Sequence, residues 1–265
     1  MDTGMVVVAA GYGSFRTENG APVPKVVELV RNIPMIAYPL RNAREIGIRR
    51  VAVVLNPRDA GTVVKAIEYA IRIGVVSHMP EIVIQPSRAG SADAVLGAIP
   101  MLRKGRIRTA LITYGDMPMW SAHTFRRVVD ATSDGSTVTM VTVVRNERFA
   151  PLERYGRIVR RRDGGIRRVI EVDDPMITKE DLAKPRVNPS LWAWDMDWLE
   201  DAIPRIVPFK KTDGYGDERY MPPLIGMAVD ERRMVSEIPL HAAQSREALG
   251  VNTPEELRRL QRFKV

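Results

Sequence analysis

The segment from Met5 to Lys25 combines a glycine-containing loop with a lysine, and together these can bind phosphate. Met5 to Ala10 is apolar and rich in β-branched residues, which is typical of a buried parallel strand, and Gly11-Tyr12-Gly13-Ser14 follows directly. Glycines permit positive φ, so this loop can turn several backbone N–H groups toward one anion. We interpret the loop and Lys25 as a phosphate site; an ordinary turn with an unrelated lysine is the alternative.

The same segment excludes two common nucleotide-binding motifs. Position 16 is Arg16, so the spacing is not Gly-x-Gly-x-x-Gly, and the chain contains no Gly-Lys-Ser or Gly-Lys-Thr of a P-loop.

Asp116 is a second candidate, because it follows an apolar run and precedes Met117-Pro118. A carboxylate at the tip of a central strand can hold a divalent ion against a phosphate in the neighbouring loop; a turn or capping aspartate is the alternative. Asn252 precedes Thr253, the better helix cap, which leaves the Asn252 amide oxygen for the same metal. With no cysteine and three histidines, we expect a hard ion with oxygen ligands.

A regular alternation of strands and helices must position these residues. The hydrophobic pattern predicts strands at 5–10, 51–55, 82–85 and 110–114, and helices at 34–46, 60–73, 91–101 and 121–131. This alternation is typical of an α/β fold with a doubly wound, mostly parallel, mixed sheet flanked by helices. Ligands of such sheets bind beyond the carboxyl ends of the strands, where the loops 11–25, 85–91 and 114–118 all lie.

The second half of the chain has a different pattern. It predicts strands at 137–144, 187–194 and 234–240, a hairpin at 155–159 and 166–171, helices at 196–206 and 217–227, and a capped helix from Thr253 to about Phe263. We expect an antiparallel subregion that forms a substrate-facing wall, with Trp192 and Trp194 in the core. No linker divides the chain, so we expect one domain with halves at 1–132 and 133–265.

Composition narrows the class of protein. The net charge is +8, but the densest basic cluster, at 154–168, contains the turn Asp163-Gly164-Gly165 and is interpreted as a solvated hairpin rather than a nucleic-acid site. No apolar run is long enough for a membrane span, and no signal peptide is recognised. The absence of cysteine excludes thiol catalysis and fits the cytoplasm. We expect a cytoplasmic protein without nucleic-acid or membrane partners; an oligomer is compatible with the sequence.

A series of short motifs, each weak alone, occurs in order along nearly the whole chain. They are Ala9-Ala10-Gly11-Tyr12-Gly13-Ser14 with Pro24-Lys25, Gln85 with Gly90-Ser91, Tyr114-Gly115-Asp116-Met117-Pro118, Tyr155-Gly156-Arg157-Ile158, Ile170-Glu171, Val187-Asn188, Asp217-Glu218-Arg219-Tyr220 and Gly250-Val251-Asn252. In this order they resemble the sugar-nucleotide pyrophosphorylases, a nucleotidyltransferase family, and most closely the uridylyltransferase domain of bacterial N-acetylglucosamine-1-phosphate uridylyltransferase.

The resemblance implies a Rossmann-like nucleotidyltransferase fold and an enzyme with Mg²⁺ as cofactor. It would join UTP to a sugar-1-phosphate, such as N-acetylglucosamine-1-phosphate or a related hexose-1-phosphate, by in-line attack on the α-phosphorus, giving a UDP-sugar and pyrophosphate. The implied nucleotide-binding residues are Ala9, Ala10, Gly11, Tyr12, Gly13, Ser14, Gln85, Gly90, Ser91, Tyr114 and Gly115. Gly156, Glu171 and Asn188 are the implied contacts of the sugar phosphate in the second half, Asp116 and Asn252 the Mg²⁺ ligands, and Lys25, Arg16 and Asp116 the catalytic residues.

Some positions depart from the family pattern. Phe15 stands where the family has a loop arginine, so we assign that role to Arg16; a different mode of triphosphate binding is the alternative. Val172-Asp173 replaces a basic residue after Glu171, and Asn188-Pro189-Ser190 replaces an Asn-Thr-Gly turn. Cytidylyl or other nucleotidyl transfer to a non-sugar acceptor, and a catalytically weakened regulator, are therefore kept as alternatives. Bifunctional members begin a left-handed β-helix where this sequence ends, so we expect no acetyltransferase domain.

Overall fold

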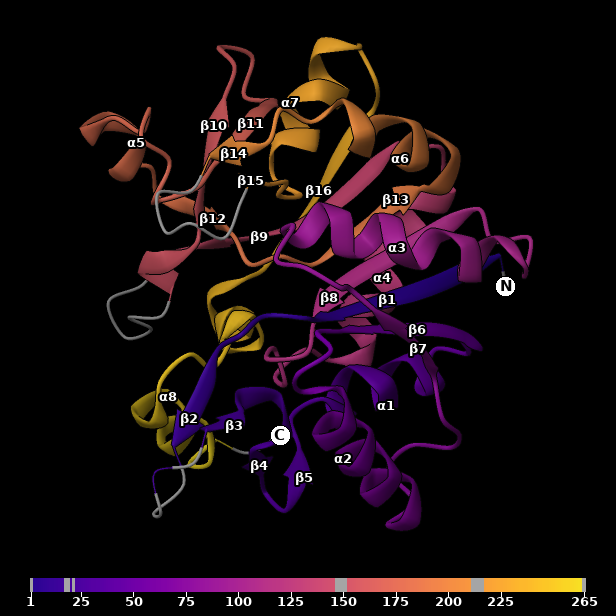
Figure 1. Cartoon of the computed structure of the whole chain (residues 1–265). Coiled ribbons are helices and arrows are strands. Elements are labelled where there is room, and N and C mark those ends of the chain that lie inside the picture. Colours follow the sequence, from indigo (N-terminus) through magenta and orange to yellow (C-terminus); the bar gives the residue numbers. More distant parts are fainter. Residues whose placement is uncertain (1, 17–19, 21, 146–151, 211–216, 264–265) are drawn as a thin grey trace.

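The protein is described by a computed structural model, which covers residues 2–16, 20, 22–145, 152–210 and 217–263, with the backbone alone for Ser14, Arg16 and Lys210. A central sheet runs through the molecule, with helices on both of its faces (Figure 1). Within the described residues, no helix is both long enough and apolar enough to cross a membrane.

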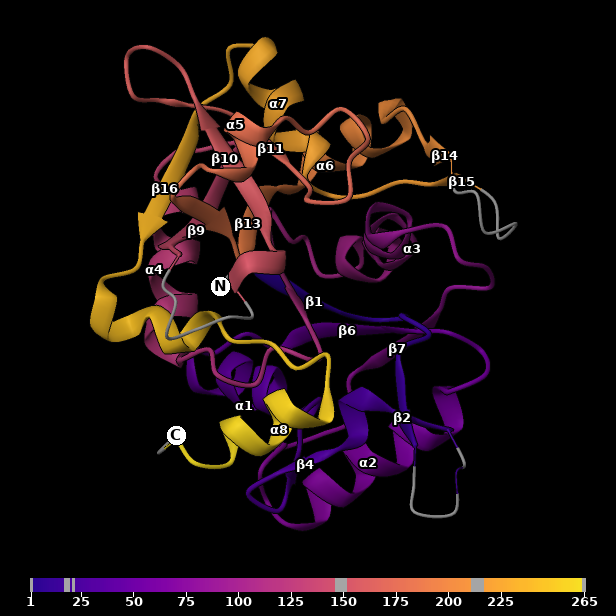
Figure 2. The same cartoon turned by 90° about the vertical axis from the view of Figure 1, so that its left-hand side faces the viewer.

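Four parallel strands form the first part of the sheet, in the order β7 (Glu81–Ile84), β6 (Arg50–Leu55), β1 (Thr3–Ala9) and β8 (Thr109–Tyr114). On one face lie α1 (Ala37–Glu45), α2 (Ala60–Arg72) and α4 (Ala122–Ser133), and on the other lies α3 (Ser91–Arg103) (Figure 2). The side chains of β1 alternate between the two cores and are all buried. The predicted doubly wound α/β fold is confirmed.

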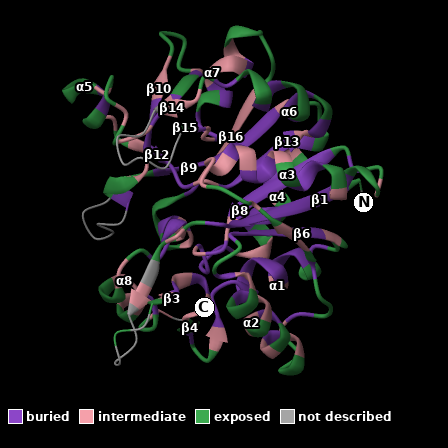
Figure 3. Cartoon of the chain, in the orientation of Figure 1, coloured by how far each residue is buried: buried purple, intermediate pink, exposed green. Residues whose placement is uncertain are grey.

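The second half extends the same sheet with antiparallel strands. β13 (Trp192–Asp195) lies between β8 and β9 (Val138–Val144), and β16 (Val235–Pro239) runs parallel to β9. β12 (Arg186–Asn188) links β9 to the hairpin of β10 (Gly156–Arg160) and β11 (Ile166–Ile170). α6 (Met196–Ala202) and α7 (Pro223–Asp230) share the core of α3, where Trp192 and Trp194 are fully buried, as predicted. Figure 3 shows the central strands buried beneath exposed helix faces.

Short elements complete the described chain. They are the pair β2 (Ser14–Arg16) and β3 (Pro22–Pro24), η1 (Lys25–Val27), the pair β4 (Leu29–Val30) and β5 (Ile33–Pro34), α5 (Lys179–Leu182), η3 (Ile203–Arg205), the pair β14 (Phe209–Lys210) and β15 (Asp217–Glu218), η4 (Ala242–Ala248) and α8 (Pro254–Leu260). The predicted capping box of α8 is present at Thr253 and Glu256. The Gln261 side chain donates to the Leu29 carbonyl at 3.2 Å, so the C-terminal segment lies beside the N-terminal hairpins.

The prediction of one continuous strand at 187–194 is wrong, because the structure has two strands there, β12 and β13, with a break between them. β12 and β13 bond the same edge of β9, because the amides of Val141 and Arg145 donate to Leu191 and Pro185. Between the pairs Val187↔Val143 and Trp192↔Met140, one strand advances five residues and the other three. Pro189 has no N–H to donate and Ser190 adopts a φ of 61°, so this stretch bulges out of the ladder.

Three predicted helices have different bounds, and proline is present at each discrepancy. The helix predicted at 34–46 begins at Ala37, because Pro34 belongs to the β4–β5 pair. The helix predicted at 196–206 gives way at Ala202 to a 3₁₀ turn that contains Pro204. The helix predicted at 217–227 begins at Pro223, because Asp217 and Glu218 pair with β14 and Pro222 and Pro223 have no N–H with which to continue a helix from preceding residues.

Most arginines of the basic hairpin are exposed, but Arg160 is half-buried and Arg157 is buried. Arg157 is only 2% exposed, and it donates to the backbone carbonyls of Glu153, Tyr155 and Leu182. The prediction of a solvated hairpin is therefore wrong for Arg157, which ties β10 to its neighbouring loops.

Candidate active site

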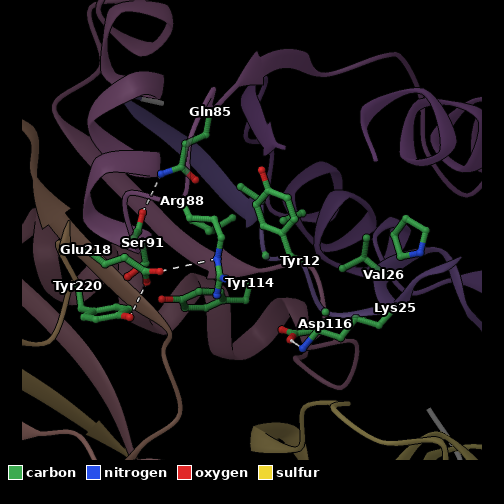
Figure 4. A pocket seen from close by; sticks show the side chains of 17 residues that line it. Tyr12, Lys25, Val26, Gln85, Arg88, Ser91, Tyr114, Asp116, Glu218 and Tyr220 are labelled. Atoms are coloured by element: carbon green, nitrogen blue, oxygen red, sulfur yellow. Dashed lines mark hydrogen bonds and ion pairs between the residues drawn. The ribbon is translucent and has the colours of Figure 1, made fainter. Parts of the chain in front are cut away.

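A cleft of about 300 Å³ opens at the carboxyl ends of β1, β7 and β8, and we call it the glycine-loop cleft (Figure 4). Its walls come from the loops that follow these strands, together with Lys25, Glu218 and Tyr220. This is the edge of the sheet at which an α/β fold is expected to bind its ligands.

Lys25, Asp116 and Asn252 converge at one end of this cleft. The Lys25 ammonium lies 2.5 Å from Asp116 Oδ2 and donates to Asn252 Oδ1 at 2.6 Å. The three side chains come from the start of η1, the end of β8 and the residue before the α8 cap, and the Val251 amide donates to the Asp116 carbonyl at 3.0 Å. The structure thus brings together three predicted residues that are far apart in sequence.

The loop after β1 leaves its backbone amides available. Ala9, Ala10, Gly11, Tyr12 and Gly13 all line the cleft, and the amides of Gly11, Tyr12 and Gly13 donate no hydrogen bond to any described residue. Neither Gly11 nor Gly13 uses the positive φ that glycine permits. A Cβ at Gly11 would meet nothing within 4 Å, so this glycine leaves open space over the loop.

Two arginines that sequence reasoning missed frame the glycine loop. The guanidinium groups of Arg58 and Arg88 lie 4.8 Å and 5.5 Å from the centroid of the Tyr12 ring. Arg58 also donates to the Tyr12 carbonyl at 3.2 Å, and Arg88 lines the cleft. Arg88 lies inside the loop 85–91 that the sequence analysis singled out, so its charge was the available signal. Phe15 packs against the core, and the side chain of Arg16 lies outside the described part of the structure.

The predicted base-binding residues form the far wall of the cleft. The Gln85 side chain donates from Nε2 to the Gly90 carbonyl at 2.9 Å, and its Oε1 accepts no hydrogen bond from a described residue. Gly90 has a φ of +92°, and a Cβ there would lie 2.1 Å from the Arg219 carbonyl oxygen. Only glycine therefore fits where the loop meets the segment after β15. Ser91 accepts from the Met221 amide at 3.2 Å and fixes the same contact.

A second cavity of about 460 Å³ adjoins the cleft and shares Ser91, Tyr114, Glu218 and Tyr220 with it. We call it the acidic cavity, because Glu171, Asp173, Asp174 and Glu218 all line it. Tyr114 lies in the shared wall, and burial raises the pKa of its hydroxyl, which therefore stays protonated at neutral pH.

Glu171 is the predicted sugar-phosphate residue that reaches the acidic cavity. Burial, followed by the charge of Asp173, raises the pKa of the Glu171 carboxyl to about 7, and Arg157 opposes this shift. Gly156 lies directly behind it, because a Cβ at that position would be 2.8 Å from Glu171 Oε1. Asn188 pairs with Gly156 across the two strands, so all three predicted residues are neighbours, but only Glu171 lines the cavity.

Two further predicted residues do not line either cavity. Gly115 follows β8, but its Cα faces the core, where a Cβ would lie 2.7 Å from Ile36 Cδ1. It is a packing glycine that allows the turn into Asp116. Ser14 begins β2 and pairs with Pro24, while its side chain lies outside the described part of the structure.

Comparison with known proteins adds three findings. The family model described as Nucleotidyl transferase matches residues 17–214. The bifunctional protein GlmU of Anaeromyxobacter sp. (strain Fw109-5) is 33% identical over 255 residues, which cover 96% of this chain and 47% of that relative. The GlmU of Trichlorobacter lovleyi is 29% identical over 248 residues, which cover 93% and 49%. The chain therefore spans about half the length of the curated relatives it matches.

A solved structure supports the fold alone. The 4-diphosphocytidyl-2C-methyl-D-erythritol synthase from Anaerococcus prevotii gives a TM-score of 0.62 at 11% identity, and the match covers 98% of this chain and 96% of that one.

Proposed function

Because the chain belongs to the nucleotidyl transferase family, we propose that it joins UTP to a sugar-1-phosphate and releases pyrophosphate. N-acetylglucosamine-1-phosphate and related hexose-1-phosphates are the acceptor class suggested by the resemblance to GlmU. The observation that carries this proposal is the convergence of Lys25, Asp116 and Asn252 beside a glycine loop with unused backbone amides.

The reaction requires the protein to position the substrates and to neutralise charge, and it requires no covalent bond between protein and substrate. An oxygen of the acceptor phosphate attacks the α-phosphorus of the triphosphate, a new P–O bond forms, and the bond to the bridging β-phosphate oxygen breaks. The electron pair of that bond leaves with pyrophosphate. Lys25 carries a positive charge at the mouth of the glycine loop, where it neutralises charge on the phosphates as the reaction proceeds. The amides of Gly11, Tyr12 and Gly13 orient the same phosphates.

The donor set suits Mg²⁺. Asp116 Oδ2 and Asn252 Oδ1 both face the Lys25 ammonium, so an anionic and a neutral oxygen already converge on a cation. The described residues hold no group of three or more His, Cys, Asp or Glu that would form an all-protein metal cage. A site with two protein oxygens fits Mg²⁺, which usually keeps waters and takes its other ligands from substrate phosphates. When bound, Mg²⁺ would supply charge neutralisation on the triphosphate.

Gln85 supports selection of a base that donates a hydrogen bond. Its Nε2 is committed to the Gly90 carbonyl, which leaves Oε1 as an acceptor. Uracil carries such a donor at N3, and a site that must hydrogen-bond its substrate discriminates strongly against a base that lacks the donor. Because the amino group of cytosine also donates, cytidylyl transfer is the second candidate that a nucleotide panel must separate.

The test is a pyrophosphate-release assay with Mg²⁺, in which UTP, dTTP, CTP and GTP are combined with a panel of sugar-1-phosphates. We expect release with UTP and a hexose-1-phosphate. Asp116→Asn should lower kcat by about 10²-fold or more, the scale of losing one charged group at a transition state. Asp130→Asn, at the opposite end of the strands, is the matched control and should leave turnover unchanged. Release only with CTP and a non-sugar phosphate would replace the proposal by its alternative, and tight nucleotide binding without turnover would favour a regulator.

A further inference from the structure

The acidic cavity has no described cation in its walls. Its described lining residues include the carboxylates of Glu171, Asp173, Asp174 and Glu218, and none of them is lysine, arginine or histidine. Glu218 has a cationic neighbour on the cleft side, where Arg88 Nε lies 3.8 Å from its Oε1. Glu171, Asp173 and Asp174 form no ion pair with any described residue, so the charge of the described lining residues is negative.

The surroundings of Glu171 compensate this charge only in part, since Arg157 lowers the pKa of its carboxyl but does not restore the ordinary value. Burial and Asp173 raise the pKa of its carboxyl to about 7, and the charge of Asp174 adds to the effect. Arg157 lies on the adjacent strand, but its guanidinium donates to the carbonyls of Glu153, Tyr155 and Leu182 instead of forming a pair with Glu171. The charge of Arg157 therefore offsets the carboxylates of the cavity only in part, and a cationic group inside the cavity would gain further attraction.

Aromatic rings complete the wall. Tyr114, Phe209 and Tyr220 line the cavity, and the Phe209 and Tyr220 rings are 6.3 Å apart at a tilt of 58°. Carboxylates combined with aromatic faces are the chemistry by which proteins bind ammonium groups. An anionic group has no described partner here, whereas Lys25 lies in the adjoining cleft.

We propose that the acceptor is a phosphate monoester that carries a protonated amine, with its phosphate toward Lys25 and its ammonium in the acidic cavity against Glu171, Asp173 and Asp174. This inference rests on the proposed nucleotidyl transfer and names the class of acceptor. The two cavities adjoin at Ser91, Tyr114, Glu218 and Tyr220, and the proposal requires that one small molecule spans them there. An amino sugar-1-phosphate and a small amino-alcohol phosphate both have this chemistry.

The decisive experiment compares three acceptors that differ only at one carbon. Glucosamine-1-phosphate, N-acetylglucosamine-1-phosphate and glucose-1-phosphate place an ammonium, an acetamide or a hydroxyl group at C2 of the same scaffold. With the nucleotide that the panel shows to be preferred, we expect kcat/KM for the ammonium compound to exceed the values for the acetamide and hydroxyl compounds by about tenfold or more. This is the effect of one partly buried ion pair. Equal rates, or a preference for acetamide or hydroxyl, would overturn the proposal. Phosphoethanolamine and phosphocholine form a separate arm, and a preference for them would keep the ammonium but replace the sugar.

Two variants locate the effect. Asp173→Asn and Asp174→Asn remove one charge each while preserving shape, and each should reduce the ammonium preference several-fold by raising KM with little change in kcat. Asp163→Asn, in the exposed turn of the β10–β11 hairpin, is the charge-matched control and should retain the preference. A preference that survives in the double variant Asp173→Asn/Asp174→Asn would place the ammonium elsewhere.

Binding measured without turnover distinguishes failure of the proposed nucleotidyl transfer from failure of the ammonium site. Isothermal titration calorimetry with the three acceptors, in the presence of a non-hydrolysable nucleotide, reports the acidic cavity directly. If no acceptor gives pyrophosphate release, nucleotidyl transfer to these compounds is refuted, while tighter binding of glucosamine-1-phosphate than of glucose-1-phosphate still supports the ammonium site. Equal or absent binding of the two sugars refutes the ammonium site even if turnover is observed.

Discussion

The two adjoining cavities share four wall residues but handle charge in opposite ways. In the glycine-loop cleft, Lys25 is held between Asp116 and Asn252, and Arg88 lies opposite Glu218. In the acidic cavity, Glu171, Asp173 and Asp174 have no described ionic partner. The cleft thus combines cations, amides and oxygen ligands suited to polyphosphate, whereas the cavity offers anions and aromatic faces.

The difference follows from the elements that build each cavity. The cleft is formed by loops at the ends of parallel strands, of which β1 and β8 are buried on both faces and β7 is a partly exposed edge strand, so most of its geometry is fixed by the core. The acidic cavity is formed by the end of the β10–β11 hairpin and by loops around β14 and β15. We infer that the parallel sheet supplies the chemistry common to the family, and that the antiparallel addition selects the acceptor.

The strongest test of this division is Lys25→Met. The change removes the cation between Asp116 and Asn252 while keeping a chain of similar length, and we expect kcat to fall by about 10³-fold, equivalent to about 4 kcal/mol. Lys65→Met, on the exposed face of α2, is the control and should leave kcat unchanged. Acceptor selectivity, measured as the ratio of kcat/KM values for two acceptors, should survive in the residual activity of Lys25→Met. A loss of selectivity with little loss of rate would reverse the roles assigned to the two cavities.

Gly90→Ala should have the next largest effect, on stability. An alanine there adopts an unfavourable φ of +92° and places its Cβ 2.1 Å from the Arg219 carbonyl oxygen, so the loop and the segment after β15 must separate. We expect a loss of about 3 kcal/mol in the free energy of unfolding, measured by urea denaturation. Gly61→Ala is the matched control, because Gly61 has open space in α2, and it should be neutral or slightly stabilising. Equal midpoints for the two variants would show that the loop adapts freely.

The sequence predicted the cleft better than the cavity, for a physical reason. The cleft depends on strand order and on loops that directly follow apolar strands, and both are visible as local pattern. Asn252 was predicted from its position before a helix cap, and it does meet Lys25. The acidic cavity depends on how the hairpin, the bulge at Pro189–Ser190 and the loop near Phe209 pack together, and no local pattern encodes that packing.

Individual residues show the same limit of prediction from local sequence pattern. The sequence drew attention to the glycines at positions 11 and 13, but it is Gly90 whose backbone requires glycine, because it has a positive φ and touches a segment about 130 residues away. Arg88 was overlooked although its charge lies in the loop 85–91, because its position over Tyr12 depends on how that loop packs against the glycine loop. The roles of all the predicted site residues stay predictions, and for Arg16, Gly156 and Asn188 the structure places no described side chain in either cavity.

The partly compensated charge of the acidic cavity should appear in the pH dependence of stability. The pKa of Glu171 is about 7 in the folded protein and has its ordinary value of 4.5 in the unfolded chain, so between these values only the folded state holds the proton. Stability from this group is therefore present at low pH and is lost as the pH rises through 7. Relative to Glu171→Gln, the wild type should lose on the order of 2 kcal/mol between pH 5 and pH 8.

Thermal denaturation of both proteins across this pH range measures the effect. An amine-bearing phosphate should reduce the loss, because its ammonium stabilises the ionised carboxylate, whereas glucose-1-phosphate should not. Parallel pH profiles of the wild type and Glu171→Gln would show that the cavity is compensated after all.

Gly156→Ala should have the smallest effect, and it should change the KM for the acceptor alone. The new Cβ would lie 2.8 Å from Glu171 Oε1 and 2.9 Å from Val169 Cγ1, so the carboxylate must shift within the acidic cavity while the glycine-loop cleft stays untouched. We expect the KM for the acceptor to rise about tenfold, equivalent to about 1.4 kcal/mol, with the KM for the nucleotide unchanged. Gly226→Ala is the control, because a Cβ at Gly226 would lie at an ordinary distance of 3.5 Å from Arg168 Cβ on β11. If the KM for the nucleotide rose instead, the two cavities would act as one site, and the division between common chemistry and acceptor selection would fail.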